Sequence, residues 1–504
     1  MRHTSHPLVY EINTRCWLWS LSQSAGHSVT LSDVPDSQFE FWRDLGFTHV
    51  WLMGVWRTGP HARAHSLNLA ELRQASPPCM EEEIGGSPYA IAGYEVSPSL
   101  GGNAGIVEFR RRLRSHGMKL ILDFVPNHLG RDHPWLSERP ELFVQGKQNR
   151  DGTFRQDTNN GQAWLAYGKD PYMGAWVDTV QLDYRNPATR DAMTMEVQRV
   201  AELCDGVRCD MAMLLLNEVF ARTWSDFPSS FPGRHTEFWA ECIGAVRQRF
   251  PNFVFVAEAY WNLESQLHEL GFDFTYDKRL YDYLVSKNAA AVQQHLLGHP
   301  VQFVQHGAHF LENHDEQRIA ALLSFPEHRA AALLILGLPG LCLLHEGQLT
   351  GARNRLSVHL ERRRFESEQA DIFEFYGGIL KVLQQTAVGA GQATLLRPRE
   401  AWSGNPTHLN FVAVQWRSKA DSFEVVLVNL APHDGQCYLD LQGDDIGDSG
   451  WLMSDLLGPQ VFEREGSDLK KSGLYLDVPA HGAQILQFVP QPRMARVLTS
   501  SRSG

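Results

Sequence analysis

The feature that most constrains the fold is a series of eight short apolar segments, most of which end in polar residues. They are 8–12, 48–55, 119–125, 206–210, 253–258, 272–276, 308–315 and 337–345. Stretches with helical periodicity separate them, among them 36–45, 104–117, 190–203, 238–250 and 317–336. Alternating strand and helix signals predict βα units and a parallel sheet. Eight such units predict an α/β fold of the closed (β/α)8 TIM barrel type.

Two long insertions and a change of pattern predict the domain organisation. A barrel of about 250 residues allows roughly 31 residues per βα unit, and the interval from the third to the fourth segment is much longer. Its excess, 130–183, is expected to form a small excursion domain after strand three, and a second long loop, 56–88, follows strand two. The barrel would then comprise 1–129 and 184–385. Alternating strands over 386–490 predict an all-β sandwich, and the basic, Ser-rich tail 491–504 is expected to be disordered.

Charge and cysteine usage narrow the class of protein. The 504 residues carry a net charge of -12, which argues against nucleic acid or an anionic membrane as the main partner. No apolar segment is long enough to span a membrane, and the first residues show no signal-peptide pattern. The 7 cysteines are scattered without a zinc-binding spacing. We therefore expect a cytoplasmic protein with buried thiols, and its oligomeric state stays open.

Polar residues gather where the predicted strands end, the edge of such a barrel that carries active sites. The residues are Asp123, Asn127, His128, Arg208, Asp210, Glu258, His314 and Asp315. Like charges pressed into one cleft cost stability, which functional sites tolerate. Cleavage of a glycosidic bond requires such a set, with one ionised carboxylate as nucleophile and one protonated carboxyl group as acid.

The two chemical roles can be assigned from neighbouring residues. Arg208 lies two positions before Asp210, so both side chains point to one face of a strand, and we expect the guanidinium to lower the pKa of Asp210. Glu258 lies among apolar neighbours, which favour a protonated carboxyl group. Asp210 is thus the predicted nucleophile and Glu258 the predicted general acid.

Four ordered motifs resemble those of the α-amylase superfamily, glycoside hydrolase family 13. They are 123–128, 206–212, 256–258 and 310–315, and the segments 87–89, 93–94 and 100–102 look like the stretch before strand three of that family. The resemblance covers roughly residues 8–349. It implies a retaining mechanism through a covalent glycosyl intermediate.

The resemblance also implies a role for each matching residue. Asp210 would attack the anomeric carbon, Glu258 would protonate the departing oxygen, and Asp315 would bind hydroxyl groups of the same sugar. His128 and His314 would hydrogen-bond this sugar, Arg208 would hold Asp210, Tyr89 would stack beneath the ring, and Trp261 would line the leaving-group side. Asp123 and Asn127 are expected to orient neighbouring groups. Packing or structural roles remain the alternatives for Tyr89, His128, Asp123 and Trp261.

No cofactor or metal ligand is predicted at the site. Asn127 matches one calcium ligand of the family, but Gln181 stands where the resemblance places an acidic ligand. A neutral amide is a weaker ligand for a hard cation than a carboxylate, so bound calcium is not expected.

The main hypothesis is a retaining α-glycosidase that cleaves α-glucosidic bonds of maltooligosaccharides or related α-glucans. An alternative is an α-glucan transglycosidase or a disaccharide isomerase that uses the same site. A third is a catalytically inactive barrel that serves as a binding subunit. The preference among α-1,4, α-1,6 and α-1,1 linkages stays open, and Met211, which follows the predicted nucleophile, does not decide it.

Overall fold

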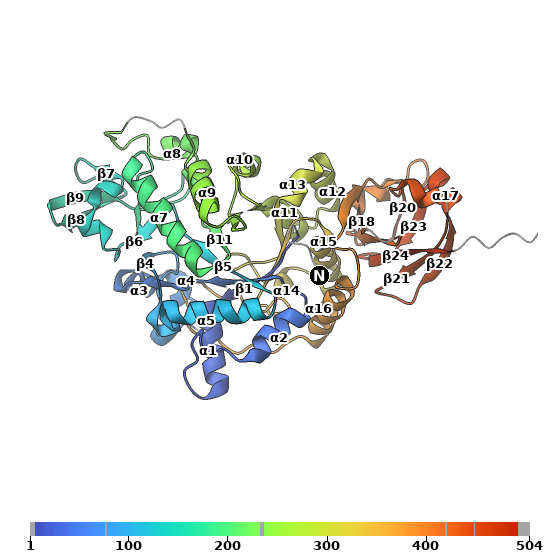
Figure 1. Cartoon of the computed structure of the whole chain (residues 1–504), viewed down its shortest axis with the longest axis horizontal. Helices are drawn as coiled ribbons and strands as arrows, with labels where there is room; N and C mark the ends of the chain where they lie inside the picture. The colour runs from blue at the N-terminus through green and yellow to red at the C-terminus, as the bar shows by residue number, and fades with distance from the viewer. Residues whose placement is uncertain (1–5, 76–77, 232–235, 419–420, 448, 492–504) are drawn as a thin grey trace, which may run out of the picture.

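The computed structural model describes residues 6–75, 78–231, 236–418, 421–447 and 449–491. Its centre is a closed ring of eight parallel strands (Figure 1). In ring order they are β1 (Leu8–Asn13), β2 (His49–Met53), β5 (Lys119–Phe124), β11 (Gly206–Cys209), β12 (Val254–Ala257), β13 (Phe274–Tyr276), β14 (Gly307–Phe310) and β15 (Leu341–His345). Six strands fall within the predicted apolar segments, β1 ends one residue after its segment and β14 begins one residue before its own, so the predicted barrel is confirmed.

Amphipathic helices surround the ring because their apolar faces pack on the strands. They include α2 (Asp36–Asp44), α5 (Gly102–Ser115), α7 (Pro187–Leu203) and α9 (Phe238–Arg249). The prediction of one helix over 317–336 is wrong, since the segment forms α14 (Ile319–Leu322) and α15 (Phe325–Gly337). Ser324 and Glu327 form a capping box at the start of α15, with a proline in its first turn, and this combination begins a new helix.

The excursion after β5 forms a small unit of its own, at the upper left of Figure 1. Its β6 (His128–Gly130) and β10 (Thr179–Gln181) pair antiparallel, and β7 (Gln145–Gly146), β8 (Thr153–Thr158) and β9 (Gly161–Ala166) form a second sheet. The predicted loop 56–88 contains regular structure. It holds β3 (Trp56–Thr58), α3 (Pro60–Ser66), α4 (Ala70–Arg73) and the short 3-10 helix η1 (Glu81–Glu83).

The C-terminal domain is built from a six-stranded and a three-stranded antiparallel sheet with a separate apolar core. The larger sheet contains β18 (Phe411–Arg417), β19 (Phe423–Asn429) and β24 (Ala483–Gln491). Gln491 therefore ends a strand, one residue beyond the predicted boundary, and the predicted disorder of the remaining tail concerns 492–504, which lie outside the described residues. Trp416 fixes this domain to the barrel, because its Nε1 donates to the carbonyl oxygen of Gly337 at 2.8 Å.

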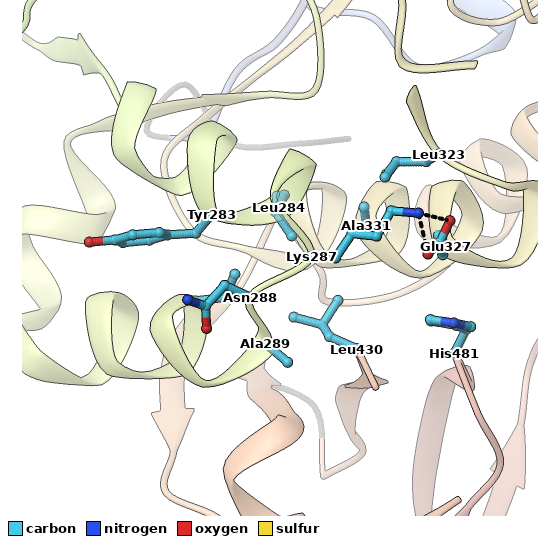
Figure 2. Close-up of a pocket in the computed structure, with 11 residues that line it drawn as sticks. Tyr283, Leu284, Lys287, Asn288, Ala289, Leu323, Glu327, Ala331, Leu430 and His481 are labelled. Atoms are coloured by element: carbon cyan, nitrogen blue, oxygen red, sulfur yellow. Dashed lines mark hydrogen bonds and ion pairs between the residues drawn. The ribbon is translucent and has the colours of Figure 1, made fainter. Parts of the chain in front are cut away.

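A small recess lies between α11 (Lys278–Val285), α12 (Ala289–Gly298), α15 and two loops of the C-terminal domain (Figure 2). Lys287 crosses it to pair with Glu327 at 2.8 Å.

In the part of the chain that the structure describes, no helix has the length and apolar character needed to cross a membrane.

Candidate active site

Asp210 and Glu258 share one guanidinium group. Arg208 Nη1 donates to Asp210 Oδ1 at 2.8 Å, and Arg208 Nη2 lies 2.8 Å from Glu258 Oε2. All three side chains are buried. Arg208 lies on β11 and Glu258 follows the neighbouring strand β12, so both acids stand at the carboxyl edge of the barrel. The structure thus brings the predicted nucleophile and the predicted acid to one point.

Three aromatic rings surround Arg208. Its guanidinium carbon lies 5.5 Å from the ring centroid of Trp51, 5.4 Å from that of Tyr89 and 5.6 Å from that of Tyr276. Such cation–π contacts strengthen when the cation is desolvated. Burial lowers the pKa of Arg208, but Glu258 and the other neighbours raise it well above its usual range. Arg208 is therefore a fixed positive charge between the two acids.

The expectation that Arg208 lowers the pKa of Asp210 overall is wrong. Burial raises the pKa of Asp210 to about 7; Arg208 opposes this shift, whereas the charge of Glu258 adds to it. The cost of removing a carboxylate from water outweighs the single cation at this depth. Glu258 contacts the same guanidinium, so the charges of the two carboxyl groups act on each other at short range. A pair with one ionised and one protonated member suits glycosidic cleavage.

Two further donors fix the carboxyl group of Glu258. The Met211 N–H donates to Oε2 at 2.7 Å, and the Tyr260 hydroxyl donates to Oε1 at 2.7 Å. Met211 has a φ of 45°, in the left-handed region that side-chain-bearing residues rarely adopt. Strain of this kind concentrates at functional sites. Met211 therefore positions the acid through its backbone.

The third acid, Asp315, stands beside a charged imidazole. His314 Nε2 lies 3.1 Å from Asp315 Oδ2 and 2.7 Å from the Tyr89 hydroxyl, and His314 Nδ1 lies 2.5 Å from Glu11 Oε1. Burial lowers the pKa of His314, but Asp315 and Glu11 raise it well above its usual range. Burial raises the pKa of Asp315, but His314 outweighs this and holds it well below its usual range. The structure therefore places an ion pair at the third predicted position.

Asp315 is more exposed to solvent than Asp210 and Glu258. The side chain of Asp315 is 44% exposed, compared with 9% for Asp210 and 5% for Glu258. Asp315 is therefore free to meet a ligand directly, whereas the buried acids are reached only at the bottom of the site.

Asp123 contacts protein groups at the end of β5. It accepts hydrogen bonds from Trp51 Nε1 at 3.2 Å and from the Gly54 N–H at 2.9 Å. Burial raises its pKa to about 6. These bonds orient Trp51 against Arg208, which is the kind of supporting contact expected of this residue.

Asn127 and Gln181 join the excursion domain to the barrel. Gln181 Nε2 donates to Asn127 O at 2.9 Å, to Asn127 Oδ1 at 3.0 Å and to Leu182 O at 3.1 Å, while Gln181 Oε1 accepts from Asn127 Nδ2 at 3.3 Å. The Gln181 side chain is fully buried. Asn127 thus faces this junction and not the acids.

The same residues test whether the junction could hold the calcium ion that the resemblance implies. A calcium ion requires several converging oxygen ligands. Here the N–H₂ group of Gln181 already donates to Asn127 O, Asn127 Oδ1 and Leu182 O, which are the oxygens that the ion would need. The residues present therefore do not fit the ion. Within the described ranges, no cluster of three or more His, Cys, Asp or Glu side chains is arranged to hold a metal.

His128 lies beside this junction, on β6. Its ring centroid is 5.1 Å from that of Trp176, and its side chain hydrogen-bonds the backbone of Tyr89. Burial lowers the pKa of His128 to about 4, so the ring is neutral at pH 7.

Trp261, three residues after Glu258, is partly buried and packs against an exposed aromatic residue of the excursion domain. Its ring centroid lies 4.9 Å from that of Tyr172, at an interplanar angle of 78°. Tyr172 and Met173 of the excursion domain are 65% and 69% exposed. We call Tyr172, Met173 and Trp261 the aromatic lip. Trp261 and Asn262 have φ values of 65° and 62°, so the backbone is strained where it leaves Glu258.

Sequence reasoning missed several residues of the site. Glu11 lies on β1 and holds His314, Tyr276 ends β13 and contacts Arg208, and Tyr260 donates to Glu258. An acid inside the apolar segment 8–12 was a usable signal for Glu11, because the carboxyl ends of all eight strands meet at one edge. The exposed Tyr172 carried no comparable signal.

The geometry is that of a known family, and a family model described as alpha amylase, catalytic domain, matches residues 36–377. The chain therefore belongs to the alpha-amylase family.

Two curated relatives and one solved structure illustrate the range of similar proteins. Alpha-amylase MalA of Haloarcula japonica is 24% identical over 354 residues, which cover 69% of this chain but 44% of the relative. Alpha-1,4-glucan:maltose-1-phosphate maltosyltransferase of Pseudomonas aeruginosa is 29% identical over 201 residues, which cover 38% of this chain and 25% of the relative. The chain thus spans less than half the length of these relatives. The maltogenic alpha-amylase AmyB of Thermotoga neapolitana has a TM-score of 0.66 and 20% identity, with 97% of this chain and 100% of that chain covered, and shows the shared fold.

Proposed function

We propose that this chain is a retaining α-glycosidase that cleaves α-glucosidic bonds of maltooligosaccharides or related α-glucans. One observation supports this most strongly: two buried carboxyl groups share Arg208 while a third, exposed acid stands beside a charged His314. Membership of the alpha-amylase family agrees with this chemistry.

In the first step, an Asp210 carboxylate oxygen bonds to the anomeric carbon as the bond from that carbon to the leaving oxygen breaks. Glu258 gives its proton to the leaving oxygen. In the second step, Glu258 takes a proton from water, and the water oxygen replaces Asp210 on the anomeric carbon. Arg208 stabilises the carboxylate form of each acid in turn, since it contacts both.

The third acid acts on the sugar in the transition state of each step. Asp315 is ionised and exposed, so it can bind hydroxyl groups and stabilise the positive charge that develops on the sugar ring. The charged imidazole of His314 holds Asp315 and the Tyr89 hydroxyl in place against the same sugar. The ring of Tyr89, held by its hydroxyl against His314, supplies an apolar face for stacking.

Transfer to a second sugar is the alternative outcome of the same covalent intermediate. The aromatic lip supports it, because the exposed ring of Tyr172, which packs on Trp261 three residues after the acid, can hold an acceptor sugar in place of water. A relative named as a maltosyltransferase agrees with this possibility. A disaccharide isomerase would use the same two steps with the leaving sugar as acceptor.

We further propose that no metal or other cofactor is needed and that the chain works in the cytoplasm. The amide of Gln181 supports the first proposal, since it bonds the oxygens that a junction ion would need. The absence of any disulfide bond among the described residues supports a reducing compartment.

Chromatography of products from maltotriose, isomaltose, trehalose and sucrose tests the proposal. We expect turnover of at least one α-glucoside, with glucose or maltose as products of hydrolysis and longer oligomers if transfer dominates. Asp210→Asn should lower the rate by at least about 10⁴-fold, as loss of a catalytic group does in other enzymes. Binding of these sugars without turnover would instead indicate the inactive binding protein.

A further inference from the structure

Two long loops at the mouth of the barrel are joined to each other. The backbone N–H of Gly85 donates to His359 O at 2.8 Å, and that of Glu361 donates to Glu83 O at 2.8 Å, around a bridge between Ile84 and Leu360. The first segment of this contact comes from the loop after β2, and the second segment comes from the loop after β15. We call residues 83–86 and 358–361 the loop seam.

Side chains reinforce the loop seam from both ends. Arg15 Nη1 donates to Gly86 O at 2.9 Å and Arg15 Nη2 to Val358 O at 3.2 Å, so one buried guanidinium holds both loops. Arg364 Nη2 lies 3.1 Å from Glu83 Oε2. Ser66 Oγ lies 2.8 Å from His359 Nδ1. The two loops therefore move as one body, unlike loops whose backbone groups form hydrogen bonds only with water.

The strand order places the loop seam across the mouth from Glu258. In the closed ring, β1 lies opposite β12, because three strands separate them in either direction. The strands that pair with β1 are β2 and β15, whose loops form the seam. Glu258 follows β12. The seam and the general acid thus face each other across the barrel.

The seam also borders the sugar-binding residues. Tyr89 follows Gly86 by three positions, and Val358 packs on the same apolar cluster as Tyr89. Arg355, an exposed residue of the second loop, contributes to the low pKa of Asp315 and so lies within electrostatic reach of it. The seam is therefore the structure next to the sugar on the side away from the leaving group.

We propose that the loop seam closes the site to the chain beyond the non-reducing end of the substrate. The leaving group departs past Glu258 and the aromatic lip, so the rest of the substrate on the other side must end at the seam. This inference rests on the proposed glycosidase function and adds that the chain removes short units from non-reducing chain ends and does not cut internal bonds.

The test compares two maltoheptaosides with a chromogenic group at the reducing end, one with a free non-reducing end and one whose non-reducing sugar carries a 4,6-O-ethylidene block. Products are separated by chromatography. We expect kcat/KM for the blocked substrate to be lower by at least about tenfold, which corresponds to about 1.4 kcal/mol of transition-state binding. Equal turnover of both substrates would overturn the inference and leave the glycosidase function intact. No turnover of either would overturn both.

A variant that opens the seam sharpens the test. His359→Gly combined with Leu360→Gly removes the bond between His359 and Ser66 and gives the backbone more freedom at the bridge between Ile84 and Leu360, and we expect the ratio of blocked to free turnover to rise toward one. Leu457→Gly combined with Pro459→Gly, in a turn of the C-terminal domain, is the matched control and should leave the ratio unchanged. Because the readout is a ratio, partial loss of folded protein cancels. A ratio that stays low in the opened variant would show that the seam is not the barrier.

Discussion

The two sides of the barrel mouth are built in different ways. On the side of β1, backbone hydrogen bonds and buried arginine contacts join two loops into the loop seam. On the side of β12, the aromatic lip consists of side chains that are mostly exposed and belong to separate segments. Loops joined by hydrogen bonds form a rigid boundary, whereas an exposed aromatic ring can bind a leaving group or an acceptor weakly and reversibly. The comparison suggests that the substrate is held firmly at one end and released or exchanged at the other.

We call the side of the mouth that carries the loop seam the closed side and the side that carries the aromatic lip the open side. The largest loss of stability is expected from a substitution of Glu11, on the closed side. Glu11→Gln removes one of two carboxylates that keep His314 charged, and the loss of one partner of a buried ion pair costs about 3–5 kcal/mol. Thermal unfolding would show the lower stability, and kcat/KM should fall because His314 and Asp315 lose their order. Unchanged stability and unchanged kcat/KM would show that Glu11 does not support this side.

A second prediction concerns pH and the buried acid Asp210. The folded chain holds the Asp210 proton up to about pH 7, whereas the unfolded chain releases it near pH 4. The free energy of unfolding should therefore fall as the pH rises between these values, and Asp210→Asn should escape this loss. We expect the variant to gain on the order of 4 kcal/mol relative to the natural chain between pH 4 and pH 8, because the pKa of Asp210 rises from 3.8 to about 7 and one pKa unit corresponds to about 1.4 kcal/mol.

Thermal unfolding of both proteins across this pH range is the measurement. The kcat/KM of the natural chain should also decrease as the pH drops below about 7, because protonated Asp210 cannot attack. A stability difference that does not vary with pH would contradict the raised pKa.

A third prediction concerns the junction behind the mouth. Gln181→Ala removes the side-chain donor to Asn127 Oδ1 and to the carbonyl oxygens of Asn127 and Leu182, of which only the Asn127 carbonyl keeps a backbone donor among the described residues, at a cost of about 1–3 kcal/mol. A chelator should change neither the unfolding temperature nor the activity of the natural chain. Gln181→Asp is the informative partner variant, since it restores a carboxylate and should gain a calcium-dependent unfolding temperature. Inactivation of the natural chain by the chelator would contradict the proposed role of the amide.

The smallest effect is expected at the open side. Tyr172→Ala removes one exposed ring of the aromatic lip, and aromatic contacts contribute about 0.5–1.5 kcal/mol, or about threefold to tenfold in affinity. We expect a higher KM for maltooligosaccharides and less transfer relative to hydrolysis. Phe365→Ala is the matched control, because Phe365 is 94% exposed on the loop that forms the closed side. An equal effect of both substitutions would remove the distinction between the two sides.

The sequence was sufficient to predict the barrel and the position of the three acids. Buried strands appear as apolar segments, and their carboxyl ends must meet at one edge of a closed parallel sheet. Properties that depend on how deeply a side chain is buried, and contacts between distant loops, could not be predicted from the sequence. The raised pKa of Asp210 follows from burial that no residue pattern displays, and the loop seam joins residues 84 and 360, whose pairing has no local signal.

Helix boundaries show the same limit on a smaller scale. The apolar periodicity of 317–336 is continuous, yet Ser324 and the following proline divide it into α14 and α15. The capping signal was present in the sequence and outweighs periodicity, because proline cannot donate a backbone hydrogen bond within a helix.

The most direct test of the central claim is to trap the covalent intermediate. A fluorinated α-glucosyl fluoride, which forms the glycosyl-enzyme faster than water can remove it, is incubated with the whole chain, and the peptides are analysed by mass spectrometry. Our account predicts a single added glycosyl group on the peptide that contains Asp210, and no label in Asp210→Asn. Catalytic turnover without any labelled peptide, or a label on another residue, would contradict it.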